Sequence, residues 1–579
     1  MNNDINKQVY TARRRILIGG FFCITVVLTW RAVDLHIINN EFLRDHGDIR
    51  SLRVVDINAH RGMIVDRNDE PLAISTPVAT VGAYPRKLLA EPEGVAALAS
   101  LLEMETEDLV TVLRDRIGRD FIYLKRHVSP DLSADIESLG LPGVHLQREF
   151  KRYYPAGEVT SHLIGFTNVD DEGQEGLELA YDDWLRGIPG SKRVLKDSLG
   201  RTIQDVENIK SSVPGKKLVL SIDRRVQYLA YRELVAAVTR HQARGGSLVI
   251  LDIRTGEVIA LVGQPSYNPN NRAGLTGEQY RNRAVTDVFE PGSTVKPFTI
   301  AAALMSGLYT PDTLIDTAPG FMKLNNYTIR ENNNYNFKTI DLAHVIVKSS
   351  NVGASKIALS LGPERIWEMY SSFGMGRISG SGYPGESPGL FHHYRSWSEV
   401  ELATIAYGYG VAVTTLQLAQ AYSIIASGGV LKPVSFTRVD TPVNGVRVIP
   451  EQITKQITDM LEAVTKEDGT GQRAAIEGYN VAGKTGTAHK THEGGYAQDR
   501  YRSLFAGFAP ATDPVLALVV MVDEPEGLQH YGGQVAAPVF ANVMKGALRL
   551  MNIPPDAMNT MGGEFMALNN KQTGHLSPQ

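Results

Sequence analysis

The alternation of apolar and polar positions divides the chain into three stretches of different texture. An uncharged apolar run spans residues 16–30, directly after three arginines at 13–15. Residues 40–215 are mixed and charged, and turn residues separate their short apolar segments. From residue 216 onward, longer segments with strand or helix spacing follow one another. The pattern therefore predicts an apolar anchor, a mixed α/β region and a larger domain.

The larger domain shows strand patterns at both of its sequence ends and helical patterns between them. Residues 224–241 have the apolar spacing of a helix, and two apolar runs within 246–263 surround the turn Asp-Ile-Arg-Thr-Gly, which predicts a hairpin. The segment 293–430 is mainly helical in pattern, and strands return from residue 478. This order predicts an α+β fold in which one antiparallel sheet takes strands from both sequence ends.

The N-terminal apolar run predicts a transmembrane signal anchor at residues 16–36. A helix needs about 20 residues to cross the hydrocarbon of a bilayer. The alternatives are a cleaved signal peptide, which lacks a small-x-small cleavage site here, and a lipoprotein anchor, which the bulky Gly-Phe-Phe before Cys23 disfavours. The basic flank keeps residues 1–15 in the cytoplasm by the positive-inside rule. We therefore expect a single-pass protein of the inner membrane whose remaining chain lies in the periplasm.

The composition of the 579-residue chain adds a few constraints. It is 43% hydrophobic and 21% charged, as in ordinary globular proteins, and its net charge of −4 implies no nucleic-acid partner. Cys23 is the one cysteine, so no disulfide can form within the chain. The histidine pairs His392-His393 and His489-x-x-His492 lack further ligands nearby, so we predict surface positions for them and neither metal nor cofactor for the protein.

A serine followed three residues later by a lysine is the first candidate for chemistry. In Glu-Pro-Gly-Ser-Thr-Val-Lys-Pro-Phe (290–298), a turn at Pro-Gly precedes an apolar helical pattern, and positions i and i+3 share a helix face. Ser293 and Lys296 are therefore expected to touch, and no other serine has lysine at this spacing. A neutral lysine can activate a serine, provided that burial or nearby cations lower its pKa from about 10.4. The alternative is an N-capping serine beside a solvated lysine.

Two further motifs join this pair. Ser349-Ser350-Asn351 offers a hydroxyl that can relay a proton and an amide that can hold the lysine; a second S-x-N at 266–268 precedes the serine and lies in a Pro/Asn-rich loop, which argues against it. Lys484-Thr485-Gly486-Thr487 follows on a predicted strand, where Lys484 and Thr485 can face a substrate carboxylate and Gly486 can let a substrate backbone approach. The order S-x-x-K, S-x-N, K-T-G is specific, although each motif alone is weak.

With these motifs the chain resembles the class B penicillin-binding proteins, which are monofunctional D,D-transpeptidases. The resemblance runs from about residue 10 to residue 552 and is closest to the septal cell-division transpeptidases of Gram-negative bacteria. Four further segments carry it: RGMIVDRN (61–68), YGYGVAVTTLQLAQAYS (407–423), GTGQRAA (469–475) and YGGQVAAPVF (531–540).

The resemblance implies a domain order and a fold. It implies a pedestal or dimerisation-type domain of mixed α/β structure at 40–215 and a transpeptidase domain at 216–555. In the latter, a central antiparallel sheet is flanked by helices. We expect the polar C-terminal residues 556–579 to be disordered.

The resemblance also implies an acyl-serine mechanism. Ser293 would attack the penultimate D-Ala carbonyl of a stem pentapeptide, with Lys296 as the general base. Ser349 would pass the proton to the leaving amine, and Asn351 would orient Lys296 and the substrate amide.

The remaining motif residues are implied to bind substrate. Lys484 would supply positive potential, Thr485 and Thr487 would contact the carboxylate, and the backbone N–H groups of Ser293 and Thr487 would form the oxyanion hole. A β-lactam would mimic D-Ala-D-Ala and leave a slowly hydrolysed acyl-enzyme. Four tyrosines are expected to wall the cleft, with an ordinary core role as the alternative for each: Tyr407, Tyr409, Tyr501 and Tyr531.

Partners and departures follow from the same resemblance. It implies binding of the stem pentapeptide and β-lactams, and contact with the inner membrane, a lipid-II-polymerising glycosyltransferase and divisome proteins. Where relatives often carry K-S-G-T-A-R, this chain has His489, and the glycine-containing segment 491–501 follows. Since imidazole does not replace the fork of arginine, a paralogue with altered β-lactam affinity or a condition-specific role is the alternative function.

Other classes of protein fit less well. Residues 478–485 match the P-loop pattern G-x-x-x-x-G-K-T, but the sequence after Lys484 lacks the helix that such a loop requires. A β-lactamase would not need residues 40–215. A non-catalytic divisome scaffold is disfavoured by the intact motifs. A D,D-carboxypeptidase differs only in using water as the acceptor and stays open.

Overall fold

The computed structural model describes residues 2–38, 52–196, 202–441, 444–492 and 495–557. The tail that we expect to be disordered lies outside the described residues from position 558 onward. The chain forms two compact units, which we call the small and the large unit. The small unit comprises Met1–His60, Pro77–Phe150 and Gly187–Pro214, and the large unit comprises Arg61–Thr76, Lys151–Arg186 and Gly215–Gln579.

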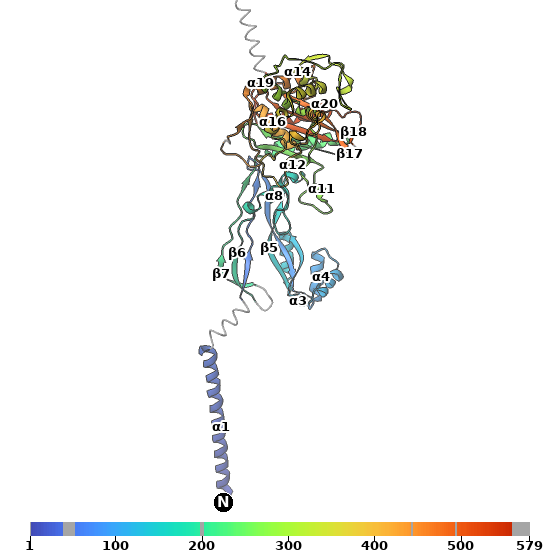
Figure 1. Ribbon diagram of the computed structural model, residues 1–579. Coiled ribbons are helices and arrows are strands. Elements are labelled where there is room, and N and C mark those ends of the chain that lie inside the picture. Colours follow the sequence, from blue (N-terminus) through green and yellow to red (C-terminus); the bar gives the residue numbers. More distant parts are fainter. Residues whose placement is uncertain (1, 39–51, 197–201, 442–443, 493–494, 558–579) are drawn as a thin grey trace, which may run out of the picture. The chain divides into compact units, whose positions relative to one another are not determined.

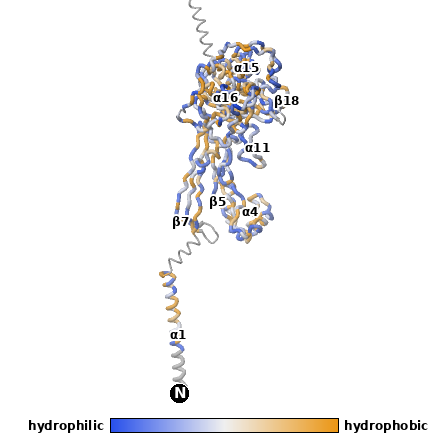
Figure 2. The backbone as a smooth tube through the Cα atoms, viewed as in Figure 1, coloured by the Kyte–Doolittle hydropathy of each residue, from blue (hydrophilic) through white to orange (hydrophobic). Residues whose placement is uncertain are grey.

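An N-terminal helix carries the apolar run. Helix α1 (Asn2–Val33) continues into a short π-helix, η1 (Asp34–Ile38). Within the described residues it is the one helix whose length and composition suit a membrane span, over Arg13–Ile38 with a mean hydropathy of 2.0. Figure 2 shows this apolar stretch in orange along α1. An apolar helix therefore carries this run, and its role as a transmembrane signal anchor at 16–36 stays a prediction.

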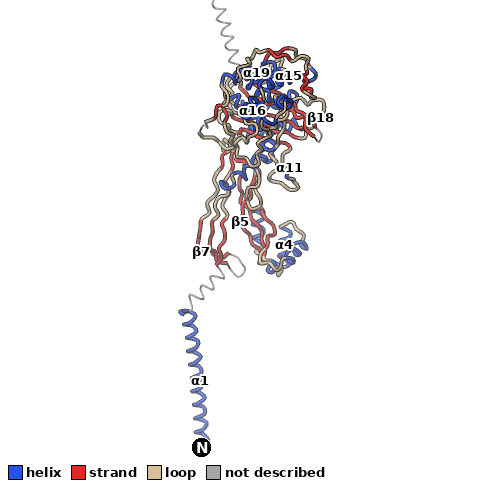
Figure 3. Tube along the Cα trace, in the orientation of Figure 1, coloured by secondary structure: helices blue, strands red, loops and turns tan. Residues whose placement is uncertain are grey.

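The rest of the small unit combines strands with a group of short helices. In α5, Leu109 and Leu113 lie one turn apart on the same face, and both are fully buried against Leu98 of α4 and Ile136 of α6. Figure 3 shows these helices in blue near the label α4. The elements are α4 (Pro92–Leu101), α5 (Thr106–Asp115), α6 (Pro130–Ser138), β4 (Ile122–Val128) and an antiparallel sheet of β1 (Leu52–Ile57), β6 (Gly190–Lys196) and β7 (Thr202–Lys210).

A five-stranded antiparallel sheet forms the centre of the large unit. Its strand order is β10-β9-β19-β18-β17, so the strands after residue 478 pair with the hairpin predicted at 246–263. Figure 1 shows green and orange-to-red strands within this unit. The predicted α+β fold with an antiparallel sheet from both sequence ends is confirmed. The strands are β9 (Gly245–Asp252), β10 (Val258–Gln264), β17 (Ala482–His492), β18 (Gly495–Ala509) and β19 (Leu516–Asp523).

Helices cover both faces of this sheet, which explains why its strands are almost continuously apolar. Successive side chains of a strand point to opposite faces. Leu248 and Ile250 pack in the core with helices α10 and α20, whereas Val249 and Leu251 pack in the core with α13 and α18. The helices of the large unit include α10 (Arg224–Arg240), α13 (Lys296–Met305), α15 (Asn351–Leu361), α16 (Pro363–Ser372), α17 (Glu399–Ile405), α18 (Thr415–Ala426), α19 (Glu451–Val464) and α20 (Gly532–Leu550).

The structure departs from the sequence pattern in the middle of the large unit. The segment 293–430, expected to be mainly helical, also contains two small antiparallel strand pairs. Their strands have only three or four residues, too few for a visible alternation. The pairs are β11 (Leu314–Asp316) with β14 (Thr339–Asp341), and β12 (Phe321–Leu324) with β13 (Tyr327–Arg330).

A buried ionic cluster lies in the N-terminal segments of the large unit. The Arg61 side chain is 1% exposed, and its guanidinium contacts Glu178 at 2.8 Å and Asp182 at 2.7 Å. Two carbonyl oxygens, of Asp171 and Glu178, accept its remaining hydrogen bonds at 3.0 Å. Glu178 is fully buried and also pairs with Arg152 at 2.6 Å, and Asp182 also pairs with Arg186. Removal of Arg61 would therefore take one of two counter-charges from each carboxylate and break an ion pair with a fully buried glutamate.

We therefore expect Arg61→Ala to lower the free energy of unfolding by about 3–5 kcal/mol, the usual effect of breaking a buried ion pair. Arg232→Ala is the matched control, since Arg232 forms an exposed pair with Glu233, and it should change the free energy by less than about 1 kcal/mol. Denaturant unfolding of the full-length protein in detergent micelles measures both. Equal effects of the two substitutions would contradict the prediction.

Candidate active site

The segment around Ser293 forms a tight turn that leads into a helix. Gly292 has a φ of +53°, and the 3-10 helix η3 (Gly292–Val295) directly precedes α13. The Thr294 hydroxyl donates to the carbonyl of Pro291 at 2.8 Å and closes the turn. As a result, Lys296 Nζ lies 2.9 Å from Ser293 Oγ, the contact expected from their spacing.

The amine of Lys296 is enclosed by the second motif. The residue is fully buried, and Nζ donates to the carbonyl oxygen of Ser349 at 2.6 Å and to Asn351 Oδ1 at 2.8 Å. Ser349 Oγ lies 3.2 Å from the same nitrogen. The predicted partners of Ser293 are therefore gathered around one atom.

Burial makes this amine weakly basic. Desolvation lowers the pKa of Lys296 to about 7, although the charge of Glu331 partly opposes the shift. A substantial fraction of Lys296 is thus neutral near pH 7 and able to accept a proton. The alternative of a solvated lysine is excluded by its burial.

Glu331, which the sequence did not single out, holds the second motif in place. Its carboxylate accepts hydrogen bonds from the Ser350 hydroxyl and, at 2.7 Å, from the Asn351 backbone N–H. Ser350 in turn caps α15 by accepting from Gly353 N at 2.9 Å. Glu331 is 3% exposed, and only the fold brings it within reach, because no motif links position 331 to 350.

Ser349 occupies a strained backbone conformation between the two lysines. Its φ is +61°, in the left-handed region that costs a non-glycine residue about 1–3 kcal/mol. Glu331 holds Ser350 and Asn351, so the chain directly after Ser349 is fixed. The strain places Ser349 Oγ 3.0 Å from Lys484 Nζ and 3.2 Å from Lys296 Nζ.

Strand β17 supplies the third motif. Lys484 is fully buried, and burial together with the nearby charge of Lys296 holds the pKa of Lys484 well below its ordinary value. Thr485, Thr487 and His489 alternate along β17 and all line the main cleft, as a period of two requires. Because Lys484 lies within a strand that continues to His492, with no helix after it, the P-loop alternative is excluded.

Two threonines of β17 are themselves held by neighbouring segments. Thr485 Oγ1 lies 2.9 Å from Thr470 Oγ1, and Thr487 Oγ1 accepts from the backbone N–H of Gly532 at 3.0 Å. Two of the segments whose sequences resemble the family therefore contact the third motif directly: residues 469–475 and 531–540.

Gly486 serves the packing of the site itself. A Cβ at this position would lie 2.8 Å from Thr294 Cγ2 and 2.9 Å from the Pro291 carbonyl oxygen. The glycine thus lets β17 approach the turn that carries Ser293. The approach of a substrate backbone, which the sequence suggested as the reason for this glycine, stays a prediction.

One cavity of about 1170 Å³, which we call the main cleft, is lined by members of all three motifs: Ser293, Ser349, Asn351, Thr485 and Thr487. Its wall includes strand β13 and the residues after it, which the sequence analysis missed because their Asn- and Tyr-rich pattern matches no motif. The four tyrosines expected in the wall do line it: Tyr407, Tyr409, Tyr501 and Tyr531. Their role in substrate binding stays a prediction.

His489, at the position where the resemblance implies an arginine, is fixed by two contacts. Its Nδ1 lies 2.8 Å from the Ala497 carbonyl oxygen, and its ring packs against Tyr501 with centroids 4.7 Å apart. Tyr501 also stacks on His530 at 4.1 Å. The segment after His489 forms the paired ends of β17 and β18, with Thr491 opposite Tyr496. The effect of His489 on ligand affinity stays a prediction.

No group of three or more His, Cys, Asp or Glu side chains suited to a metal is found within the described ranges of the chain.

Comparison with known proteins shows the family. The penicillin-binding protein transpeptidase domain matches residues 246–545, and the penicillin-binding protein dimerisation domain matches residues 56–220. The chain belongs to the class B penicillin-binding proteins. This penicillin-binding protein is 44% identical to the peptidoglycan D,D-transpeptidase FtsI of Escherichia coli strain K12, over 98% of this chain and 96% of that protein.

Further relatives agree. FtsI of Buchnera aphidicola subsp. Schizaphis graminum is 38% identical, over 95% of this chain and 97% of that protein. The crystal structure of penicillin-binding protein 3 from Mycobacterium tuberculosis in complex with aztreonam has a TM-score of 0.67 and 27% identity, covering 86% of this chain and 98% of that one. The transpeptidase domain of penicillin-binding protein 3 from Burkholderia pseudomallei has a TM-score of 0.54 and 41% identity, covering 58% and 97%.

The close contact at Gly486 yields a test of how this penicillin-binding protein builds its site. We expect Gly486→Ala to lower the free energy of unfolding by about 1–3 kcal/mol through overpacking. It should also slow labelling by penicillin, because the new methyl group displaces the turn that holds Ser293. Gly277→Ala is the control: a Cβ there meets nothing within 4 Å. Denaturant unfolding and a labelling time course measure both variants, and identical behaviour would contradict the packing role.

Proposed function

We propose that this chain is a peptidoglycan D,D-transpeptidase that crosslinks stem peptides during septal cell-wall synthesis. The observation that carries the proposal is the 2.9 Å contact between Ser293 Oγ and the buried amine of Lys296. The relatives named peptidoglycan D,D-transpeptidase FtsI support both the reaction and the septal role.

The first half-reaction is acylation of the serine. Neutral Lys296 takes the proton of Ser293, whose Oγ attacks the carbonyl carbon of the penultimate D-Ala. Backbone N–H groups of Ser293 and Thr487 stabilise the oxyanion, and each such donor contributes about 2.7–4 kcal/mol. The bond to the terminal D-Ala then breaks, and its nitrogen receives the proton through Ser349 Oγ, which lies 3.2 Å from Lys296 Nζ.

The same cleft holds the substrate for this step. Asn351 orients Lys296 through its Oδ1, while Lys484, linked to Ser349 Oγ at 3.0 Å, adds positive potential. Thr485 and Thr487, which line the main cleft from one face of β17, receive the terminal carboxylate.

The second half-reaction transfers the acyl group. An amino group of a neighbouring stem peptide attacks the ester carbonyl and gives up a proton, which neutral Lys296 receives through Ser349 Oγ. The bond between the carbonyl carbon and Ser293 Oγ then breaks, Ser293 takes the proton back from Lys296, and an amide crosslink results. With water as the acceptor, the same steps give carboxypeptidase activity. A β-lactam opens on Ser293 in the first step and blocks the second.

The N-terminal helix supports a membrane-anchored protein. The apolar helix over Arg13–Ile38 and the basic residues at its start support a single-pass inner-membrane protein with the large unit in the periplasm. Contact with a lipid-II-polymerising glycosyltransferase and with divisome proteins is the partner set that we propose for it.

The acyl-serine step is tested by the mass of the intact protein after incubation with fluorescent penicillin. The wild-type chain should gain one adduct, and Ser293→Ala should gain none. Ser306→Ala, at the other end of α13, is the matched control and should label like the wild type. An adduct on Ser293→Ala would contradict the assignment, and an adduct that clears within seconds would indicate a β-lactamase.

The pH dependence of acylation tests the role of Lys296. Because the neutral amine is the base and its pKa is about 7, the acylation rate should rise about tenfold per pH unit below 7 and level off above it. Glu331→Gln removes the charge that raises this pKa, so the rising limb should move to lower pH. Stopped-flow labelling measures both profiles; an unmoved limb in Glu331→Gln would argue against the role.

A further inference from the structure

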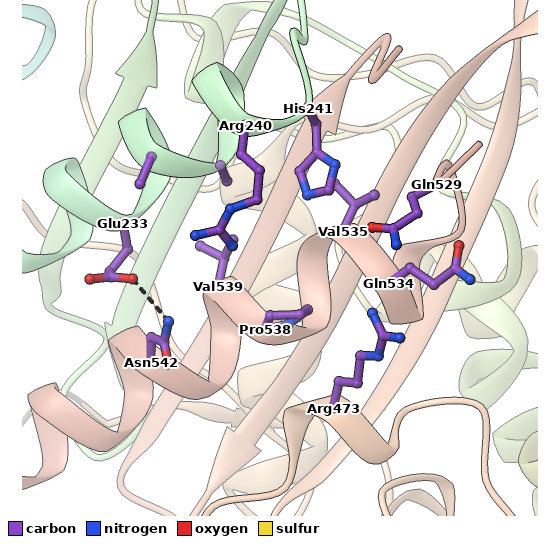
Figure 4. Close-up of a pocket in the computed structure, with 12 residues that line it drawn as sticks. Glu233, Arg240, His241, Arg473, Gln529, Gln534, Val535, Pro538, Val539 and Asn542 are labelled. Atoms are coloured by element: carbon purple, nitrogen blue, oxygen red, sulfur yellow. Dashed lines mark hydrogen bonds between the residues drawn. The ribbon is translucent and has the colours of Figure 1, made fainter. Parts of the chain in front are cut away.

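A second cavity, of about 130 Å³, lies in the large unit between the end of α10 and the first turns of α20 (Figure 4). It is not part of the main cleft, but Arg473 and Gln534 line both. Its volume corresponds to about four water molecules at about 30 Å³ each. A carboxylate or phosphate group fits a space of this size.

Two arginines from separate elements, with a histidine beside one of them, face this cavity. Figure 4 shows Arg240 and His241 extending from the end of α10, and Arg473 reaching toward them from the η6 turn (Gln472–Ala474). Among the described residues, neither Arg240 nor Arg473 has a hydrogen-bond or ion-pair partner. Burial, together with the nearness of Arg240, lowers the pKa of His241, which favours the neutral imidazole. Among the described residues, the two arginines therefore bring positive charge to the cavity without an ion-pair partner.

The one carboxylate in the wall is already engaged. Glu233 accepts from Arg232 at 2.7 Å and from Asn542 Nδ2 at 3.0 Å, and Figure 4 shows it at the far side of the cavity. Helix α20, which is 19 residues long, begins at Gly532, so its positive end lies beside the cavity, and the amide of Gln529 adds donors. The remaining polar groups thus mostly offer N–H donors.

We propose that this cavity binds a small oxyanion, a carboxylate or phosphate group, beside the main cleft. Arg240 and Arg473 supply charge-assisted hydrogen bonds from two sides. Two short segments connect the cavity with the third motif. Arg473 lies in the same segment as Thr470, which contacts Thr485. Gln534 lies in the same turn as Gly532, which donates to Thr487. Two sources supply this chemistry, a side carboxylate of a substrate peptide in the main cleft and a free phosphate ion. The first source rests on the proposed function, and the second does not.

Binding of inorganic phosphate to the full-length protein in detergent micelles is the first test. Titration calorimetry should give saturable binding at one site, weakened about tenfold or more in Arg240→Gln and in Arg473→Gln. Arg244→Gln is the matched control: Arg244 lies just beyond α10, is 71% exposed and does not line the cavity, so phosphate affinity should not change. Saturable phosphate binding that is weakened in Arg240→Gln and Arg473→Gln, and unchanged in Arg244→Gln, establishes a free anion as a ligand.

Two stem pentapeptides, one with a free and one with an amidated side carboxylate, test the other source. If the peptide supplies the anion, Arg240→Gln raises KM about tenfold for the free peptide and leaves KM for the amidated peptide unchanged. Two results together overturn the proposal: phosphate binds no better to the wild type than to Arg240→Gln, and Arg240→Gln changes KM equally for the free and the amidated peptide. Penicillin labelling of the same preparations reports on Ser293 separately, so a failure of the proposed function is distinguished from a failure of the anion site.

Discussion

The structure depends on the amine of Lys296, which is buried without an ion pair. Its Nζ reaches only neutral oxygen atoms of Ser293, Ser349 and Asn351, and the nearest opposing charge, on Glu331, binds the neighbouring segment instead. A charged amine is costly in such surroundings, so the pKa falls to about 7. Burial, rather than a special property of the residue, makes this lysine able to act as a base at neutral pH.

Holding that amine requires segments that are far apart in the chain. The turn before α13, the start of α15 and strand β17 meet because helices pack on both faces of the central sheet. Their meeting leaves little tolerance: Gly486 has no room for a Cβ, and Ser349 adopts a left-handed backbone conformation. The site is thus stabilised by the whole large unit, which offsets the local strain.

The outcomes for individual elements show why some features were predictable. The hairpin at 246–263 and the strands after residue 478 carry long apolar runs, and the S-x-x-K spacing follows directly from helix geometry, so these predictions were confirmed. The strands β12 and β13 were missed because four residues show no clear period. Glu331 was missed because its partners lie about 20 positions away, and its hydrogen bonds exist only in the folded chain.

The sequence by itself determined the family, the α+β class and the residue types of the site, since these depend on local spacing and on the order of motifs. The tertiary structure alone decided that both lysines are buried and share Ser349, that Gly486 serves packing, and that Arg240 and Arg473 face one small cavity. The physical reason is that pKa values, close contacts and cavities depend on distances between residues remote in sequence, and only packing sets those distances.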